Sequence, residues 1–248
     1  NIACNDIAVC GAKPKWLLSV FYFPENCDEN LINKITEQVN RAAKELEVMI
    51  VGGHSEFTPG LNRPLITMTA LGITKKRKYV TTSGCKKGDS IIITKSIGIE
   101  GTSILATDFH EELREKGISS EKIEEGRRFI REISVVKEAL ILADIGVNAM
   151  HDPTEGGILG GLAEMAYSSG KRIVVWENKI PISEITRLFC KALNIDPLRL
   201  ISSGALLASI SGDKVKKAIE ELGKKGIPAT VIGEVEDGEG LIVYRSNE

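Results

Sequence analysis

The sequence contains no run of about 18 apolar residues, so it offers no candidate for a transmembrane helix. Its net charge of −2 lacks the basic excess that is typical of proteins that bind nucleic acid. The five cysteines are odd in number and form no Cys-x-x-Cys pair, which argues against a zinc site or a disulfide framework. We therefore expect a cytoplasmic protein with reduced cysteines, and neither a membrane nor nucleic acid as its partner.

Two common nucleotide-binding motifs are missing as well. Residues 98–101 begin and end with glycine, but they lack the lysine and the spacing of a Walker A loop. The dinucleotide-binding fingerprint of glycines is not found anywhere in the chain. If this protein binds a nucleotide, it must do so in another way.

Strand and helix patterns alternate along the chain. Apolar residues at helical spacing predict an amphipathic helix over 29–46, and a short helix is expected over 2–11. Runs rich in β-branched and aromatic residues predict the following strands: 16–23, 48–51, 65–73, 90–94, 147–150, 173–176, 206–210, 229–235 and 240–244. An acidic turn at 237–238 joins the last two strands.

We expect an α+β or mixed α/β fold in two unequal domains, residues 1–80 and 81–248. The polar, basic stretch 75–87 is the predicted connection between them. The first domain has few strands and one long helix, which is too little to close a large sheet by itself. It is expected to pack against a partner subunit, against an upstream segment of the chain, or against both.

The motif at the centre of the chain is His-Asp-Pro-Thr-Glu-Gly-Gly, residues 151–157. It reads as the end of a strand that turns into a helix, with Asp152 or Thr154 free to cap that helix. Glycines at 156 and 157 allow the close approach of a ligand or of another backbone segment. A helix N-terminus beside a carboxylate can hold phosphate through amides and metal through oxygen. The other interpretation is a capped helix after an ordinary loop.

Two further stretches carry acids or glycines at the ends of elements, Asn5-Asp6 and Gly52-Gly53-His54-Ser55-Glu56. Phosphoryl transfer requires carboxylates that hold Mg²⁺, amides around the phosphates, and a positioned nucleophile. Carboxylates from distant parts of a chain meet that requirement if the fold brings them together. For His54 a turn residue bonded to backbone is as plausible as a catalytic role, and for His151 a structural hydrogen bond is preferred to base catalysis.

These stretches resemble a known family. Residues 5–14, Asn-Asp-Ile-Ala-Val-Cys-Gly-Ala-Lys-Pro, are similar to an N-terminal element of the aminoimidazole ribonucleotide (AIR) synthetase superfamily. Residues 52–60 resemble its Gly-Gly-(Asp/Glu)-Thr segment, and residues 151–157 resemble its Asp-Pro-Thr-x-Gly-Gly element. The order and spacing of the three agree, and the resemblance is closest to the hydrogenase maturation branch, the HypE-like proteins. It extends to about residue 244.

The resemblance implies an ATP-dependent homodimer whose N-terminal domains together form a β-barrel, with an α/β domain on each side. ATP and Mg²⁺ would lie in the cleft between domains. The resemblance implies magnesium ligands at Asp6 and Asp152 and a catalytic role for Asp152. Because His54 stands where many relatives have a carboxylate, Glu56 could take the place of that magnesium ligand, or His54 could contact phosphate directly in a catalytic role. The residues that it places around the cofactor are Asn5, Asp6, Gly52, Gly53, Thr154, Gly156 and Gly157.

Three departures from the family pattern separate two hypotheses. His54 stands where many relatives have a carboxylate, the upstream segment with its Asp-Asp pair is not in this sequence, and the sequence has no terminal cysteine. The favoured hypothesis is an enzyme that uses Mg-ATP to phosphorylate an amide-like or carbonyl oxygen of an unidentified acceptor. The alternative is a non-catalytic HypE-like nucleotide-binding or assembly dimer. A true AIR synthetase is a weaker third option.

Overall fold

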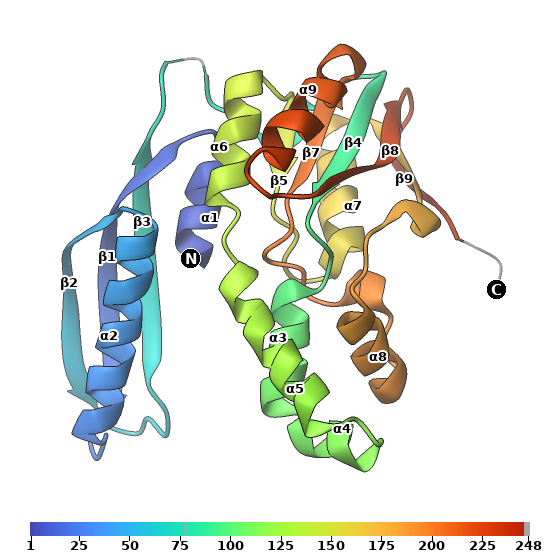
Figure 1. Ribbon diagram of the computed structural model, residues 1–248. Coiled ribbons are helices and arrows are strands. Elements are labelled where there is room, and N and C mark those ends of the chain that lie inside the picture. Colours follow the sequence, from blue (N-terminus) through green and yellow to red (C-terminus); the bar gives the residue numbers. More distant parts are fainter. Residues whose placement is uncertain (77, 246–248) are drawn as a thin grey trace.

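The computed structural model describes residues 1–76 and 78–245. In Figure 1 a small sheet with its helices lies on one side and a larger sheet with a helical lobe below it lies on the other. The predicted mixture of helices and strands is confirmed. The two sheets fall on either side of residue 80, and the domain bounds 1–80 and 81–248 stay a prediction.

The small sheet has the strand order β2-β1-β3, in which β2 is parallel and β3 antiparallel to β1. Helix α2 is the crossover between the two parallel strands, and α1 lies between β3 and α6 (Figure 1). The bounds of these elements are α1 Ile2–Val9, β1 Lys13–Pro24, α2 Glu29–Glu45, β2 Met49–Thr58 and β3 Leu65–Ile73.

The large sheet has the strand order β5-β7-β4-β8-β6-β9. Its neighbours are antiparallel except β6 and β9, which are parallel. The strands are β4 Asp89–Thr94, β5 Ala149–His151, β6 Arg172–Trp176, β7 Leu207–Ser211, β8 Ala229–Glu236 and β9 Gly240–Tyr244. The helices of this part are α3 Ile99–Asp108, α4 His110–Glu115, α5 Ser120–Arg127, α6 Val136–Ile145, α7 Gly157–Ser169, α8 Glu184–Leu193 and α9 Gly212–Gly223.

Both faces of the large sheet are covered by apolar side chains. In β4, Ile91 and Ile93 pack into a core with residues of α7, whereas Ile92 packs into a core with residues of α6 and α9. Successive side chains of a strand point to opposite faces, so an uninterrupted apolar run indicates a strand that is buried on both sides. All three isoleucines have 0% of their surface exposed, and β4 therefore anchors the sheet.

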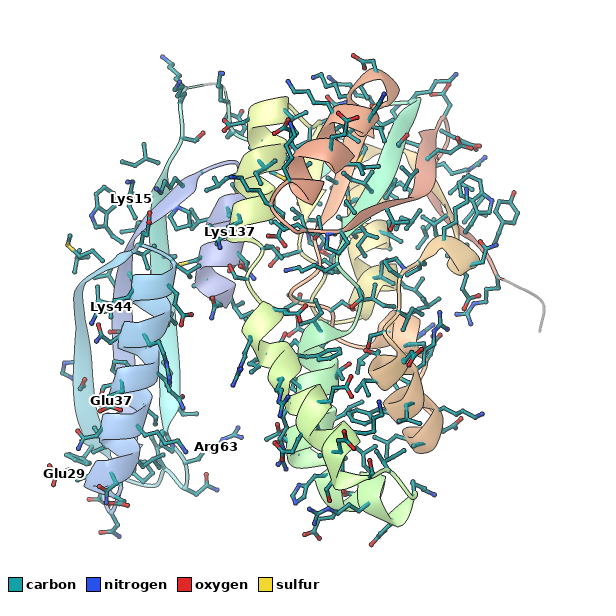
Figure 2. All side chains as sticks on the ribbon, in the orientation of Figure 1. Lys15, Glu29, Glu37, Lys44, Arg63 and Lys137 are labelled. Carbon is teal, nitrogen blue, oxygen red and sulfur yellow. The ribbon has the colours of Figure 1, made fainter. Side chains whose placement is uncertain are left out.

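The small sheet is covered on one face only. Leu17 of β1 packs into a core with Ala8 of α1 and Ala43 of α2, so the two helices cover the same face. Cross-strand partners share a face, and Trp16, one residue away from Leu17, is paired with Met49 and Leu71. Large apolar side chains from all three strands are exposed on this open face: Trp16, Leu18, Met49, Leu65, Leu71 and Ile73. Figure 2 shows Glu29, Glu37 and Lys44 spaced along α2 on the covered side.

The strand and helix predictions hold with two differences. The second strand runs on through Gly52 and Gly53 to Thr58, because it pairs with β1 along its whole length. The last two strands are not paired with each other, since both lie beside β6. None of the helices in the described residues is both long and apolar enough to cross a membrane.

Candidate functional site

Asp152 lies in the loop between β5 and α7 and is buried, with 5% of its surface exposed. Its Oδ2 atom has no hydrogen-bond partner among the described residues. Burial and, to a smaller extent, the negative charge of Asp6 raise the pKa of Asp152 to about 7. An unpartnered buried carboxylate oxygen is costly in a folded protein, and it marks a position where a cation or a proton is expected.

Asp6 comes from helix α1 and is the electrostatic neighbour of the loop that carries Asp152. Burial raises the pKa of Asp6, and the nearby His151 opposes that rise. The two acids are 146 residues apart in the sequence, and each lies in a motif that the sequence analysis selected. The structure therefore brings together the two carboxylates that the resemblance placed at the site.

His151 ends strand β5 and lies beside both acids. Its Nε2 atom is 3.0 Å from Oε2 of Glu164 on α7. Burial lowers the pKa of His151, although the charges of Glu164 and Asp6 raise it. The preferred structural role for this histidine agrees with the contact to Glu164, which fixes the ring against the helix.

Cys10 is a neighbour of the site that the sequence analysis did not select. Burial raises the pKa of its thiol, and the charges of Asp6 and Asp152 raise it further. The thiol is thus close enough to both acids for their charges to act on it. Its place in the first quoted motif, four residues after Asp6, was the signal that could have identified it, because residues four apart share a helix face. The thiol stays protonated at neutral pH and is a poor nucleophile.

Helix α7 begins at Gly157 with Gly156 at its N-cap, and no side chain in the described part of the chain caps it. The expectation that Asp152 or Thr154 caps this helix is therefore wrong. Instead, the backbone carbonyl of Thr154 accepts the N–H of Gly157. Gly156 has φ +80°, which favours glycine. A side chain at Gly157 would come within 2.6 Å of the carbonyl oxygens of Leu198 and Leu200. Gly157 is therefore needed because the backbone of another segment lies too close to leave room for a side chain.

His54 and Glu56 lie on strand β2, away from this loop. They form a pair with Nε2 of His54 3.1 Å from Oε2 of Glu56, and the hydroxyl of Thr58 donates to the same carboxylate. The hydrogen bond from His54 lowers the pKa of Glu56. Because they pair with alternate residues of β1, Val20 and Tyr22, both side chains lie on the open face of the small sheet.

The described residues contain no group of three or more His, Cys, Asp or Glu side chains that could hold a metal ion. Within one chain, Glu56 therefore does not join Asp6 and Asp152. The assignment of Glu56 as a magnesium ligand and of His54 as a catalytic residue stays a prediction.

Gly52 and Gly53, which the resemblance places around the cofactor, do not lie in a turn. Both lie inside β2, and a side chain at Gly53 would come within 1.8 Å of the carbonyl oxygen of Ser19 on β1. The register between β1 and β2 shifts at Leu17 and Leu18, next to these glycines. The glycines are needed for the close pairing of the two strands, and their contact with a cofactor stays a prediction.

Asn5 is fully buried, with 0% of its surface exposed. Its Nδ2 atom donates to the carbonyl of Ile133 at 2.9 Å, and its Oδ1 atom accepts the N–H of Val135, also at 2.9 Å. The side chain is engaged with backbone from the second half of the protein. The expected direct contact of Asn5 with a cofactor does not fit this burial.

The chain matches two family models. The AIR synthase related protein N-terminal domain matches residues 1–74, and the C-terminal domain of the same family matches residues 86–246. The two models divide the chain between the two sheets.

Individual relatives agree with the family models. A putative hydrogenase expression/formation protein of Methanocaldococcus jannaschii is 31% identical over 246 residues, covering 96% of this chain and 70% of the relative. The carbamoyl dehydratase HypE of Azotobacter vinelandii is 28% identical, covering 93% of this chain and 66% of the relative. This chain thus spans about two thirds of the length of the curated relatives that it matches.

The fold is also that of a solved relative. The structure of the hydrogenase maturation protein HypE in complex with ATP superposes with a TM-score of 0.82 and 23% identity, covering 98% of this chain and 74% of that one. The expectation of an enzyme class agrees with the enzyme name of the Azotobacter relative. On the two family models and the Methanocaldococcus relative, the chain belongs to the AIR synthase related protein family.

Proposed function

We propose that this protein is an ATP-dependent enzyme that phosphorylates an amide-like or carbonyl oxygen of an acceptor. The observation that carries the proposal is the unpartnered, buried Oδ2 of Asp152 beside Asp6, as seen among the described residues. Phosphorylation of such an oxygen makes it a leaving group for a later step. A curated relative named carbamoyl dehydratase and a related structure solved with ATP support this class of reaction.

The residues at the site fit a magnesium ion. Mg²⁺ prefers carboxylate oxygens and keeps several waters, so it needs only one or two protein carboxylates. Asp6 and Asp152 would supply them, and the positive charge of the cation would offset the burial and the repulsion from Asp6 that raise the pKa of Asp152. When bound, the ion would neutralise charge on the phosphates during transfer. Glu56 would enter such a site only through an assembled dimer.

The loop around Asp152 would position the phosphates. Helix α7 begins five residues after Asp152, and the first N–H groups of a helix carry a partial positive charge that favours anions. Thr154 and Gly156 lie between the acid and that helix, where they would shape the edge of the phosphate site. ATP would thus lie between α1 and the start of α7.

We also propose that two copies pair through the open face of the small sheet. The face exposes a row of large apolar side chains from all three strands, among them Met49 and Ile73, which are 64% and 57% exposed. Exposed apolar surface of this extent marks an interaction site. A second copy would cover this surface and complete the β-barrel that the family resemblance implies.

A second candidate function is a nucleotide-binding or assembly dimer without turnover. The observation in its favour is His54, which stands on the open face and is paired with Glu56, where many relatives have a carboxylate. Such a protein would bind Mg-ATP through Asp6 and Asp152 and would not release phosphate. The test below separates the two functions.

The test is calorimetric titration of the full-length protein with Mg-ATP, followed by measurement of phosphate release. Asp152→Ala should weaken Mg-ATP binding by at least about 100-fold, because it removes a charged group that contacts the metal. Its circular dichroism should be unchanged. Glu155→Gln, which changes the neighbouring exposed acid, should bind within about threefold of the wild type.

The outcomes are distinct. Binding with phosphate release supports the enzyme, and binding without release in the presence of amide and carbamoyl acceptors supports the assembly dimer. If the wild type does not bind Mg-ATP, or if Asp152→Ala binds as tightly as the wild type, the nucleotide site proposed here is wrong.

A further inference from the structure

The segment 132–135, which connects the helical lobe to α6, is held by side chains from two distant parts of the chain. Asn5 of α1 binds the carbonyl of Ile133 and the N–H of Val135. From the other direction, Nζ of Lys95 donates to the carbonyls of Glu132 and Ser134, at 2.9 and 2.8 Å. The two side chains bind successive backbone groups along the segment in alternation, so the segment joins α1 to the end of β4.

Lys95 is itself held in place. Its Nζ atom is 2.7 Å from Oε1 of Glu138 on α6, and Glu138 is only 3% exposed. Lys95 has a positive φ of 55°, which is uncommon for a residue with a side chain. A strained backbone and a buried ion pair at one residue indicate that the surrounding structure determines its position closely. The segment 132–135 therefore has a closely determined position, and Asn5 attaches helix α1 to it.

Asn5 attaches helix α1, which also carries Asp6, to segment 132–135. Adjacent residues of an α-helix point in directions about 100° apart and are separated by a rise of about 1.5 Å. With Asn5 buried against segment 132–135, the next side chain turns toward His151 and Asp152, whose pKa values respond to the charge of Asp6. The rotation of α1 about its own axis thus determines where the Asp6 carboxylate lies.

We infer that Asn5 is a positioning residue: it does not touch the nucleotide, and it clamps α1 to segment 132–135 so that Asp6 faces Asp152. The inference rests on the proposed function, since the reason to place Asp6 is the Mg-ATP site. It differs from the direct cofactor contact that the family resemblance suggested for Asn5, because the buried amide is already bonded to backbone on both its oxygen and its nitrogen.

A double-mutant cycle tests the inference. The affinity for Mg-ATP would be measured in the wild type, Asn5→Ala, Asp6→Asn and the double variant. If Asn5 acts through Asp6, Asn5→Ala alone weakens binding by about tenfold or more, and it adds no further loss when Asp6 is already Asn. If Asn5 contacts the nucleotide independently, the two losses multiply, and the inference is overturned. Asn5→Ser, which keeps a short polar side chain, serves as a second variant if Asn5→Ala does not fold.

A control separates positioning from loss of stability. Thr186 is fully buried in the helical lobe, where its hydroxyl lies 2.7 Å from the hydroxyl of Thr102. Thr186→Val removes a buried hydrogen bond far along the chain from Asn5, and it should lower the melting temperature without changing Mg-ATP affinity. An equal loss of affinity in Thr186→Val would show that Asn5→Ala acts through general destabilisation.

Hydrogen exchange gives a readout that does not require nucleotide. The amide of Val135 donates to Asn5, so its protection should fall in Asn5→Ala and stay unchanged in Thr186→Val. If the wild type fails to bind Mg-ATP, the proposed function is wrong and this measurement still tests the clamp. Unchanged protection of Val135 would overturn the clamp even if Mg-ATP binds.

Discussion

Strand β4 of the large sheet contains three consecutive isoleucines, and strand β1 of the small sheet is apolar along most of its length. In β4 the side chains on both faces are buried, whereas in β1 Trp16 and Leu18, on either side of the buried Leu17, are each 37% exposed. Both strands carry adjacent apolar residues on opposite faces, and the strands differ in what lies over those faces. Helices cover both faces of the large sheet and one face of the small sheet.

This difference shows which sheet buries its apolar surface within a single chain and which does not. The large sheet has buried its apolar surface within one chain, and its stability is a property of that chain. The small sheet leaves apolar surface exposed, and we propose that a second copy covers it. The same division separates two acids, because Asp152 on the large-sheet side is buried and Glu56 on the small sheet is exposed. Four predictions test this comparison.

The largest expected effect is on the stability of the large sheet. Ile92→Ala should lower the free energy of unfolding by about 2–5 kcal/mol, because it leaves a cavity in a fully buried core. Leu71→Ala, on the open face of the small sheet, should change it by less than about 0.5 kcal/mol in dilute protein. Urea denaturation measures both, and similar losses in the two variants would contradict the comparison.

The second prediction concerns pH. The pKa of Asp152 is raised from 3.8 to about 7, so the folded protein holds a proton that the unfolded chain releases. Its contribution to stability is fully present below pH 4 and is lost as the pH rises toward 7. In metal-free protein, Asp152→Asn should be more stable than the wild type at pH 8 by about 1–4 kcal/mol, and no more stable at pH 4.

Thermal unfolding of both proteins across this range measures the effect. The slope from His151, whose pKa burial lowers, has the opposite sign and is present in both proteins, so the difference between the two proteins isolates most of the effect of Asp152. A stability difference that does not change with pH would mean that Asp152 is ionised in the folded protein.

The third prediction concerns self-association. Leu18→Glu places a charge in the middle of the open face and should weaken dimer formation by at least about tenfold, or 1.4 kcal/mol. Gln38→Glu adds the same charge to exposed helix α2 on the covered side and should leave association unchanged. Analytical ultracentrifugation measures both variants. A monomeric wild type, or equal effects of the two substitutions, would remove the open face as the interface.

The smallest effect is expected at Glu56. Because it lies on the open face of the small sheet, Glu56→Gln should weaken Mg-ATP binding by less than about threefold, in contrast to Asp152→Ala. Calorimetry on the assembled protein measures the change. A loss as large as that of Asp152→Ala would place Glu56 in the metal site of the dimer, and it would restore the role that the family resemblance suggests.

The order of elements was predictable from the sequence because it depends on local pattern. The spacing of apolar residues in α2 and the β-branched run Ile91 to Ile93 specify a helix and a buried strand without reference to distant residues. The motifs around Asp6 and Asp152 also indicated the family, and the structure brings these two acids close enough for their charges to interact.

Only the tertiary structure decided which face each residue occupies and what contacts it. The sequence places Gly53 beside a cofactor, yet Gly53 pairs with Ser19 inside β2, where a side chain would come within 1.8 Å of the carbonyl oxygen of Ser19. The sequence suggests that Asn5 contacts a ligand, yet its side-chain amide donates a hydrogen bond to the backbone carbonyl of Ile133, 128 residues away. The local pattern of apolar residues specifies whether a segment forms a helix or a strand. The register of a strand, the face on which a side chain lies and its burial arise from contacts between segments that are far apart in the chain.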